Sequence, residues 1–149
     1  MNRSVPLLLV AFITATPALL LACEPGSATT RVRVSLQPPE GIDVAAVVIS
    51  LGYPTEKLVI EGQGPQAGRS VVANTPAGAV TASDDMDGEL RQVVAKPSPL
   101  AAGPIFDVTL KRCAGSADAV ANELTCRVID ASDPMSTKVS GARCLVTLL

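Results

Sequence analysis

The residues best suited to acid–base or metal chemistry are gathered in one acidic stretch, SDDMDGEL (83–90), which holds three aspartates and one glutamate. Several carboxylate oxygens are what a calcium ion requires. When the stretch is read as a calcium loop starting at Ser83, however, Val94 falls where a bidentate glutamate is needed. We therefore predict an acidic turn between two strands, made by Asp87 and Gly88, and no metal site.

The rest of the composition argues against catalysis. The chain has no histidine, which removes the usual general base near neutral pH and the commonest metal ligand. A glycosidase could still be built from two carboxylates, but only if the fold held them at the separation that the reaction needs. We predict that the protein is not an enzyme, has no catalytic residues and uses no cofactor.

Three of the four cysteines, Cys113, Cys126 and Cys144, lie in the last third of the chain. They indicate an exported protein in an oxidising compartment. We favour a Cys113–Cys126 disulfide, which closes a short loop and would contribute about 3 kcal/mol; Cys126–Cys144 is the second alternative. Without a CxxC spacing or any histidine, the cysteines do not resemble a zinc site.

The fourth cysteine, Cys23, ends an apolar N-terminal stretch that carries only one charge, Arg3. This is the build of a secretory signal segment. Residues 20–23 (LLAC) resemble the bacterial lipobox, which implies removal of residues 1–22 as a lipoprotein signal peptide and lipidation of Cys23. Because Glu24 follows, the resemblance implies a lipid anchor in the outer membrane or at the cell surface. Residues 23–30, rich in small polar residues and proline, are expected to form a flexible tether.

From residue 31 the hydrophobic pattern has a period of two, as in half-buried strands. The predicted strands are 31–37, 44–53, 57–61, 69–74, 89–96, 104–112, 124–131 and 142–149, separated by segments rich in Gly, Pro, Asp and Ser. Residues 115–124 are the one helical alternative, and we expect a loop there. The pattern predicts an all-β fold over residues 31–149, an antiparallel β-sandwich of about eight or nine strands.

Three segments of this domain resemble a cohesin domain, a jelly-roll β-sandwich related to carbohydrate-binding modules. In VAAVVISLGYPTEKLVI (44–60), Tyr53 and Leu58 keep the spacing of the cohesin pattern, although Pro54 replaces its aspartate. The segments DGELRQVVAKPSPLAAGPIFDVTLK (87–111) and CRVIDASDPMSTKV (126–139) resemble the late hairpin and the closing strand. The resemblance implies jelly-roll topology and a non-catalytic module that binds a dockerin-like partner protein or a polysaccharide.

The charge distribution excludes one class of partner and suggests a surface for the others. Removing residues 1–22 leaves eleven basic and fourteen acidic residues, with no basic stripe in the sequence, so we predict no nucleic-acid binding. Contact with the membrane is expected through the lipid anchor alone. We predict a binding face on the outward positions of two strands; its residues are Arg91, Asp107, Thr109 and Lys111. The alternative is a structural lipoprotein of the envelope without a specific ligand.

Overall fold

The structure is a computed structural model, and it describes residues 23–149. These residues form nine strands, one α-helix and one short 3-10 helix. In chain order the elements are β1 (Pro25–Gln37), β2 (Ala46–Gly52), β3 (Leu58–Val59), α1 (Gly64–Val71), β4 (Val72–Ala73), β5 (Val80–Asp85), β6 (Glu89–Ala95), β7 (Gly103–Cys113), η1 (Ala121–Glu123), β8 (Thr125–Ser132) and β9 (Arg143–Leu148).

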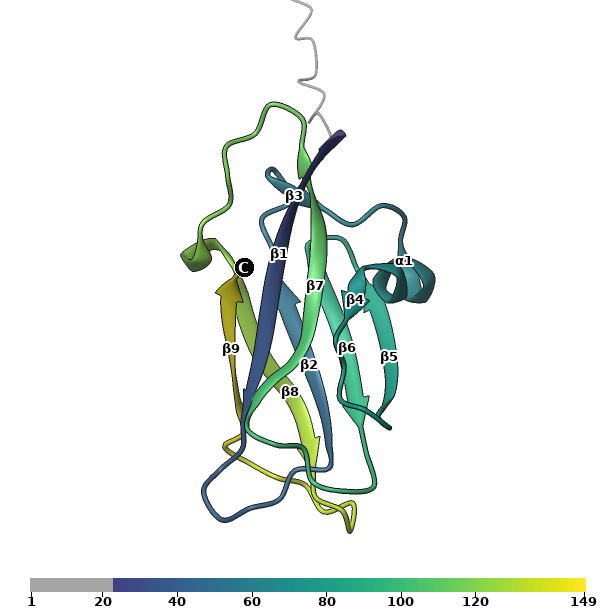
Figure 1. The fold of residues 1–149 in the computed structure, drawn as a ribbon, viewed down its shortest axis with the longest axis vertical. Coiled ribbons are helices and arrows are strands. Elements are labelled where there is room, and N and C mark those ends of the chain that lie inside the picture. The colour runs from purple at the N-terminus through teal and green to yellow at the C-terminus, as the bar shows by residue number, and fades with distance from the viewer. Residues whose placement is uncertain (1–22) are drawn as a thin grey trace, which may run out of the picture.

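The strands assemble into two sheets that lie one behind the other (Figure 1). Sheet A has the order β3-β7-β1-β9, with β4 also pairing with β7, and sheet B has the order β5-β6-β2-β8. All of these strand pairs are antiparallel. The predicted all-β antiparallel sandwich is therefore confirmed.

Alternation of side chains along the strands builds the core between the sheets. The inward residues of β1, Val32, Val34 and Leu36, are completely buried, as are Ile49 of β2 and Phe106 of β7. Because successive side chains of a strand point to opposite faces, the residues between these positions must lie on the outside of the sandwich. The inward set thus determines which charged residues of each sheet can meet a ligand.

The acidic stretch forms the hairpin between β5 and β6, as predicted. Asp87 and Gly88 both have positive φ, 54° and 82°, which is the backbone that a two-residue type I′ turn requires. The N–H of Met86 donates to the carbonyl of Glu89 across the turn at 2.9 Å. Strand β5 itself, however, was missed by the sequence pattern, because its buried residues, Ser83 and Asp85, are polar.

The strand predicted over residues 69–74 is wrong for its first half, which belongs to helix α1. Pro65 stands in the first helical turn, where its fixed φ favours a helix. The helix packs against β5 so closely that a Cβ added to Gly68 would lie 2.9 Å from Cβ of Ser83. It lies beside β4 and β5 at one side of the sandwich (Figure 1). Close packing there outweighs the β propensity of Val71, whereas Val72 begins strand β4. Residues 115–124 form the predicted loop, with the short η1 near its end.

The segment expected to be a flexible tether is ordered. Strand β1 begins at Pro25, and its N-terminal end pairs with the C-terminal end of β7, with Pro25 opposite Cys113. The N–H of Ala114 also donates to the carbonyl of Glu24 at 2.8 Å. Composition alone suggested a tether, but backbone pairing with β7 and a disulfide at Cys23 hold the segment in sheet A.

The described cysteines form two disulfides, Cys23–Cys113 and Cys126–Cys144. The favoured Cys113–Cys126 pair is therefore wrong, and the second alternative, Cys126–Cys144, is confirmed. Cys126 lies on β8 of sheet B and Cys144 on β9 of sheet A, so this bond links the two sheets. Two disulfides indicate an oxidising, extracytoplasmic environment. Within residues 23–149, no helix has the length and apolar character needed to span a bilayer.

Candidate binding surface

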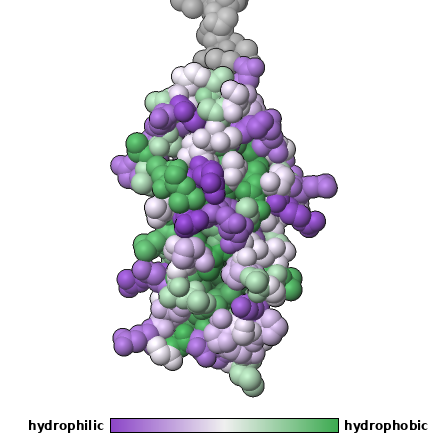
Figure 2. Space-filling view, in the orientation of Figure 1, coloured by the Kyte–Doolittle hydropathy of each residue, from purple (hydrophilic) through white to green (hydrophobic). Residues whose placement is uncertain are grey.

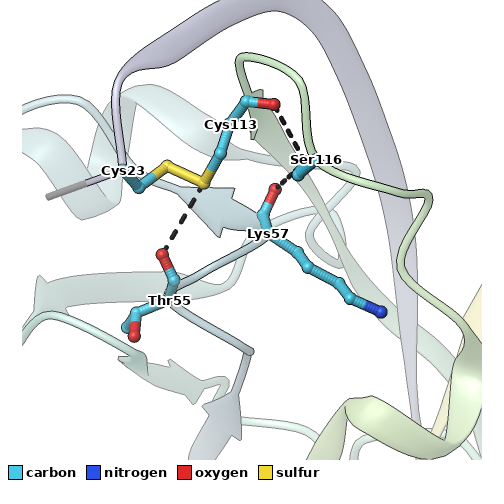
Figure 3. Close-up of a disulfide and its surroundings, with 5 residues drawn as sticks. All are labelled: Cys23, Thr55, Lys57, Cys113 and Ser116. Atoms are coloured by element: carbon cyan, nitrogen blue, oxygen red, sulfur yellow. Dashed lines mark hydrogen bonds between the residues drawn. A yellow bond between two sulfur atoms is a disulfide. The ribbon is translucent and has the colours of Figure 1, made fainter. Parts of the chain in front are cut away.

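The sulfur of Cys23 has a structural role in this fold. It is bonded to Cys113, whose carbonyl accepts from the hydroxyl of Ser116 at 2.8 Å (Figure 3). The N–H of Cys113 donates to the carbonyl of Lys57 at 2.8 Å. The carbonyl oxygen of Thr55 lies 3.6 Å from Sγ of Cys113. A sulfur in a disulfide cannot also carry a lipid, so the lipidation predicted at Cys23 does not hold for the molecule in this structure. The predicted signal peptide, 1–22, lies outside the described residues.

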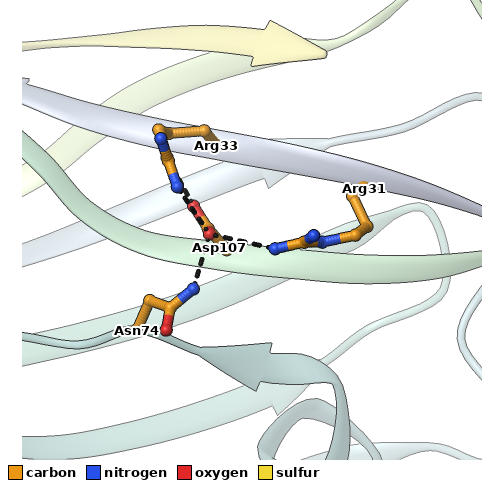
Figure 4. A network of polar contacts seen from close by, with 4 residues as sticks. All are labelled: Arg31, Arg33, Asn74 and Asp107. Atoms are coloured by element: carbon orange, nitrogen blue, oxygen red, sulfur yellow. Dashed lines mark hydrogen bonds and ion pairs between the residues drawn. The ribbon is translucent and has the colours of Figure 1, made fainter. Parts of the chain in front are cut away.

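Within residues 23–149, a cluster of four polar side chains lies on the outer face of sheet A, around Asp107 of β7 (Figure 4). Arg33 of β1 is directly opposite Asp107 in the sheet and donates to both carboxylate oxygens, from Nε at 2.8 Å and from Nη2 at 2.9 Å. Arg31 approaches the same carboxylate, with Nη2 3.6 Å from Oδ2. Asn74 donates a third hydrogen bond from Nδ2 to Oδ2 at 2.7 Å. Two cations and one amide thus converge on a single carboxylate.

Asn74 reaches this cluster through an unusual backbone conformation. It follows directly after β4, the short strand that pairs with β7 beside Asp107. Its φ is 55°, in the left-handed region that asparagine tolerates better than most residues. This turn ends β4 and brings the amide of Asn74 back over the outer face of sheet A.

Charge and burial have opposite effects on the carboxyl group of Asp107, whose side chain is only 3% exposed. The hydrogen bonds from Arg33 lower the pKa of Asp107 below its usual range, against the opposing effect of burial, and the hydrogen bond from Asn74 and the charges of Arg33 and Arg31 lower it further. In return, the hydrogen bond and charge of Asp107 raise the pKa of Arg33. Asp107 is therefore an anion that fixes the guanidinium groups above it.

The cations of sheet A form a row along the outside of β1. Within the sheet, Lys111 pairs with Thr29, Arg31 and Arg33 follow on β1, and Arg143 of β9 pairs with Gln37. We call Lys111, Arg31, Arg33 and Arg143 the cationic row. Figure 2 shows hydrophilic side chains gathered over the middle of this face, with apolar surface on either side.

The cationic row remains accessible despite its ion pairs. The side chains of Arg31, Arg33 and Lys111 are 55%, 37% and 40% exposed. Lys111 has a partner in Glu61 at the edge of the face, and Asp107 is shared by two arginines. The row thus keeps an excess of positive charge, although acidic residues outnumber basic ones in the chain as a whole. Beside Arg143 lies an open hollow of about 440 Å³, also lined by Gln37 and Pro38.

Three of the four residues predicted for the binding face lie together. Asp107, Thr109 and Lys111 are successive outward positions of β7 in sheet A. Arg91 lies on β6 of sheet B, where its Nε is 2.9 Å from the carboxylate of Glu89. A single face containing all four residues is therefore wrong, because the outward sides of the two sheets point in opposite directions. Asp107 is also buried beneath its partners instead of lying open to a ligand.

Some members of the surface were missed for identifiable reasons. Arg31 and Arg33 alternate with buried valines in the sequence, so their outward direction could be read from the pattern. Nothing in the pattern showed that β1 pairs with β7 and so places both arginines beside Asp107. Asn74 gave no signal, since its role depends on the positive φ after a strand of two residues.

A second buried carboxyl group lies at the β5–β6 hairpin. The hydroxyl of Tyr53 donates to Oδ1 of Asp85 at 2.7 Å. Burial raises the pKa of both groups, and for Tyr53 the hydrogen bond with Asp85 raises it further. Among residues 23–149, no group of three or more His, Cys, Asp or Glu side chains lies close enough to hold a metal ion.

The chain was compared with protein-family models, with curated proteins and with solved structures, and none of them matches it.

Proposed function

We propose that the protein is a non-catalytic binding module that works outside the cytoplasm, and that it binds its ligand through the outer face of sheet A. The observation that carries this proposal is the cluster at Asp107. There a buried carboxylate is shared by two arginines, with an asparagine in a left-handed conformation as its third partner, so that two exposed guanidinium groups are held side by side on one sheet face.

The cluster suits binding because it fixes arginines without using all their donors. A guanidinium group carries five N–H donors. Arg33 spends two of them on Asp107, and Arg31 makes one longer contact at 3.6 Å. Both side chains are partly exposed, so donors remain for a ligand while Asp107 restrains the guanidinium groups. Fixing side chains before binding reduces the conformational entropy that binding would otherwise cost.

The strand patterns that resemble cohesins support the same class of function, a sandwich that binds a polysaccharide or a partner protein through one sheet face. The alternative of a structural envelope lipoprotein is weaker, because it depends on a lipid at Cys23, whose sulfur is bonded to Cys113.

A partner protein is the second candidate, and the outer face of sheet B favours it. This face carries small and apolar residues on neighbouring strands, with Val48 of β2 beside Val93 of β6. Val80 of β5 is 73% exposed at its margin. It lines an open hollow of about 260 Å³ together with Ala46 and Ala95. A flat apolar surface of this kind suits contact with another folded protein.

The test compares two variants with equal loss of charge on opposite faces. Arg31→Gln/Lys111→Gln removes two cations of sheet A but leaves the Arg33–Asp107 pair intact. Arg91→Gln/Arg127→Gln removes two cations from sheet B, where both side chains are outward and exposed. The exported full chain and both variants are immobilised and exposed to the soluble polysaccharides and exported proteins of the producing organism.

We expect the unmodified chain and the sheet B variant to retain the same ligand, and the sheet A variant to lose it. Loss of the ligand only in the sheet B variant would contradict the proposal and place the binding surface on the opposite face. Melting temperatures of the two variants within about 2 °C of each other would show that the loss does not come from unfolding.

A further inference from the structure

We propose that the ligand of sheet A is an acidic polysaccharide whose carboxylate groups bind the cationic row along β1. This inference rests on the proposed function, because it names the ligand of that same surface. It begins from the spacing of the row. Lys111 lies at the level of Thr29, and Arg31 and Arg33 follow at intervals of two residues. Each interval corresponds to about 6.6–6.8 Å along the strand.

The row continues to the far end of β1. Arg143 lies at the level of Gln37, four residues beyond Arg33, which adds about 13 Å. Four cations on three neighbouring strands, β7, β1 and β9, are thus distributed over about 27 Å along the direction of β1. A single small anion would occupy only one of these positions. A linear polymer that carries a negative charge on its repeating units could engage several of them together, and such binding gains affinity from each additional contact.

The side chains in the row favour carboxylates as the charged groups. The planar fork of arginine matches the two oxygens of a carboxylate. The structure contains this arrangement already, since Arg33 binds both oxygens of Asp107, at 2.8 and 2.9 Å. Arg31 makes only one longer contact with that carboxylate, and its side chain is more exposed than those of Arg33 and Lys111. Its fork is the one best placed to receive a ligand carboxylate.

Neutral polysaccharides fit this surface poorly. Binding of an uncharged sugar face usually relies on exposed aromatic rings, which supply a large apolar area at small entropic cost. The two aromatic residues among residues 23–149, Tyr53 and Phe106, are 6% and 0% exposed. Nucleic acids are disfavoured for the same reason, since single-stranded binding also uses aromatic stacking. Charge recognition by the cationic row is what the surface offers.

The main comparison of the experiment uses two ligands that share a backbone and differ in charge. The exported full chain is tested by isothermal titration against polygalacturonate and against its methyl ester, in which the same backbone has lost its carboxylate charges. Alginate and hyaluronate extend the acidic set, and single-stranded DNA serves as a polyanion without carboxylates. The triple variant Arg31→Gln/Lys111→Gln/Arg143→Gln is compared with Arg91→Gln/Arg127→Gln/Lys138→Gln, which loses the same charge elsewhere.

We expect at least one acidic polysaccharide to bind with an affinity that falls as salt is raised, and its uncharged ester to bind at least tenfold more weakly. The triple variant of the row should lose at least tenfold in affinity, and the other triple variant should lose less than twofold. The inference is overturned if none of the acidic polysaccharides binds, if DNA binds as tightly as they do, or if the methyl ester binds as tightly as polygalacturonate. If the methyl ester binds as tightly as polygalacturonate and the triple variant of the cationic row no longer binds it, the acidic ligand is overturned but the surface on sheet A is sustained.

Discussion

The two disulfides should contribute unequally to stability, and the difference can be worked out from their positions. Cys23–Cys113 joins residues 90 apart, and Cys126–Cys144 joins residues 18 apart. A cross-link restricts the unfolded chain more when the loop is longer, which gives about 4.6 kcal/mol for the first bond and about 3.2 kcal/mol for the second. The loops do not overlap in sequence, so these contributions should add.

The value for Cys23–Cys113 is an upper limit because of how β1 begins. After Pro25 pairs with Cys113, regular pairing with β7 resumes only at Thr29, opposite Lys111. The first completely buried residue of β1 is Val32. Without the disulfide, residues 23–28 could leave the sheet without exposing the core. The entropy that they regain would reduce the cost of removing the bond.

The test removes each bond completely, as Cys23→Ala/Cys113→Ala and as Cys126→Ala/Cys144→Ala, and measures urea unfolding by circular dichroism. We expect the first variant to lose at most about 4.6 kcal/mol and the second about 3.2 kcal/mol. Amide exchange at Ala114, which donates to Glu24, should accelerate in the first variant only. The same reasoning predicts no free thiol in the exported protein. Peptides joining Cys113 to Cys126, or a purified form with lipid on Cys23 and a free Cys113, would refute it.

Three further substitutions test the polar clusters and the helix packing. Asp107→Asn should cost about 1.5–3 kcal/mol, the range for hydrogen bonds to charged groups, whereas Asp130→Asn, at an exposed and weakly paired site, should cost less than about 0.5 kcal/mol. The pKa of Asp107 is lowered by folding, so the Asp107→Asn deficit in urea unfolding should be complete at pH 7 and should shrink as the pH falls below the ordinary value of 3.8. The pKa of Asp85 shifts in the opposite direction, because burial in the folded protein raises it, although the hydrogen bond from Tyr53 partly lowers it. Tyr53→Phe removes this hydrogen bond and should destabilise the protein by about 1.5–3 kcal/mol at pH 7. The loss should be smaller at pH 3, where Asp85 is protonated in both the folded and the unfolded state. Gly68→Ala should lower the melting temperature by several degrees, because the new methyl group would lie 2.9 Å from a side-chain carbon of β5 and 3.1 Å from its backbone; an unchanged melting temperature would mean that α1 does not pack as described.

The extent to which the sequence predicted the fold follows from the range of the interactions involved. Most strands were located because alternation is a local property, and Val32, Val34 and Leu36 in β1 show it plainly. Strand β5 has no such pattern, since Ser83 and Asp85 face inward there. The buried hydroxyl of Ser83 donates a hydrogen bond to Gln92 of β6 at 2.5 Å. This contact depends on the pairing of β5 with β6. A search for alternating apolar residues cannot locate a strand whose buried residues are polar and hydrogen-bonded.

The candidate binding surface also depends on interactions between segments far apart in the sequence, which local patterns do not reveal. Outward direction was predicted correctly for Arg91 and Lys111, because it depends only on alternation within each strand. Whether two strands share a sheet depends on pairing between segments far apart in the chain. Here β6 joins β2, and β7 joins β1. The two residues therefore lie on opposite faces, and the same pairing brings Arg33 to Asp107 from 74 residues away.

Strand β1 also links the disulfide to the proposed binding surface. At its N-terminal end Cys23 is bonded to Cys113, and near its middle the carbonyl of Arg31 accepts a hydrogen bond from the N–H of Leu149 at 3.0 Å. Strands β7 and β9 pair with it on either side. The backbone that carries Arg31 and Arg33 is therefore held by hydrogen bonds on both sides, and Asp107 binds the two side chains. Loss of the Cys23–Cys113 bond should weaken ligand binding by less than about threefold, because pairing with β7 and β9 persists around Arg31. Loss of Asp107 should weaken binding more, since it releases the arginines themselves.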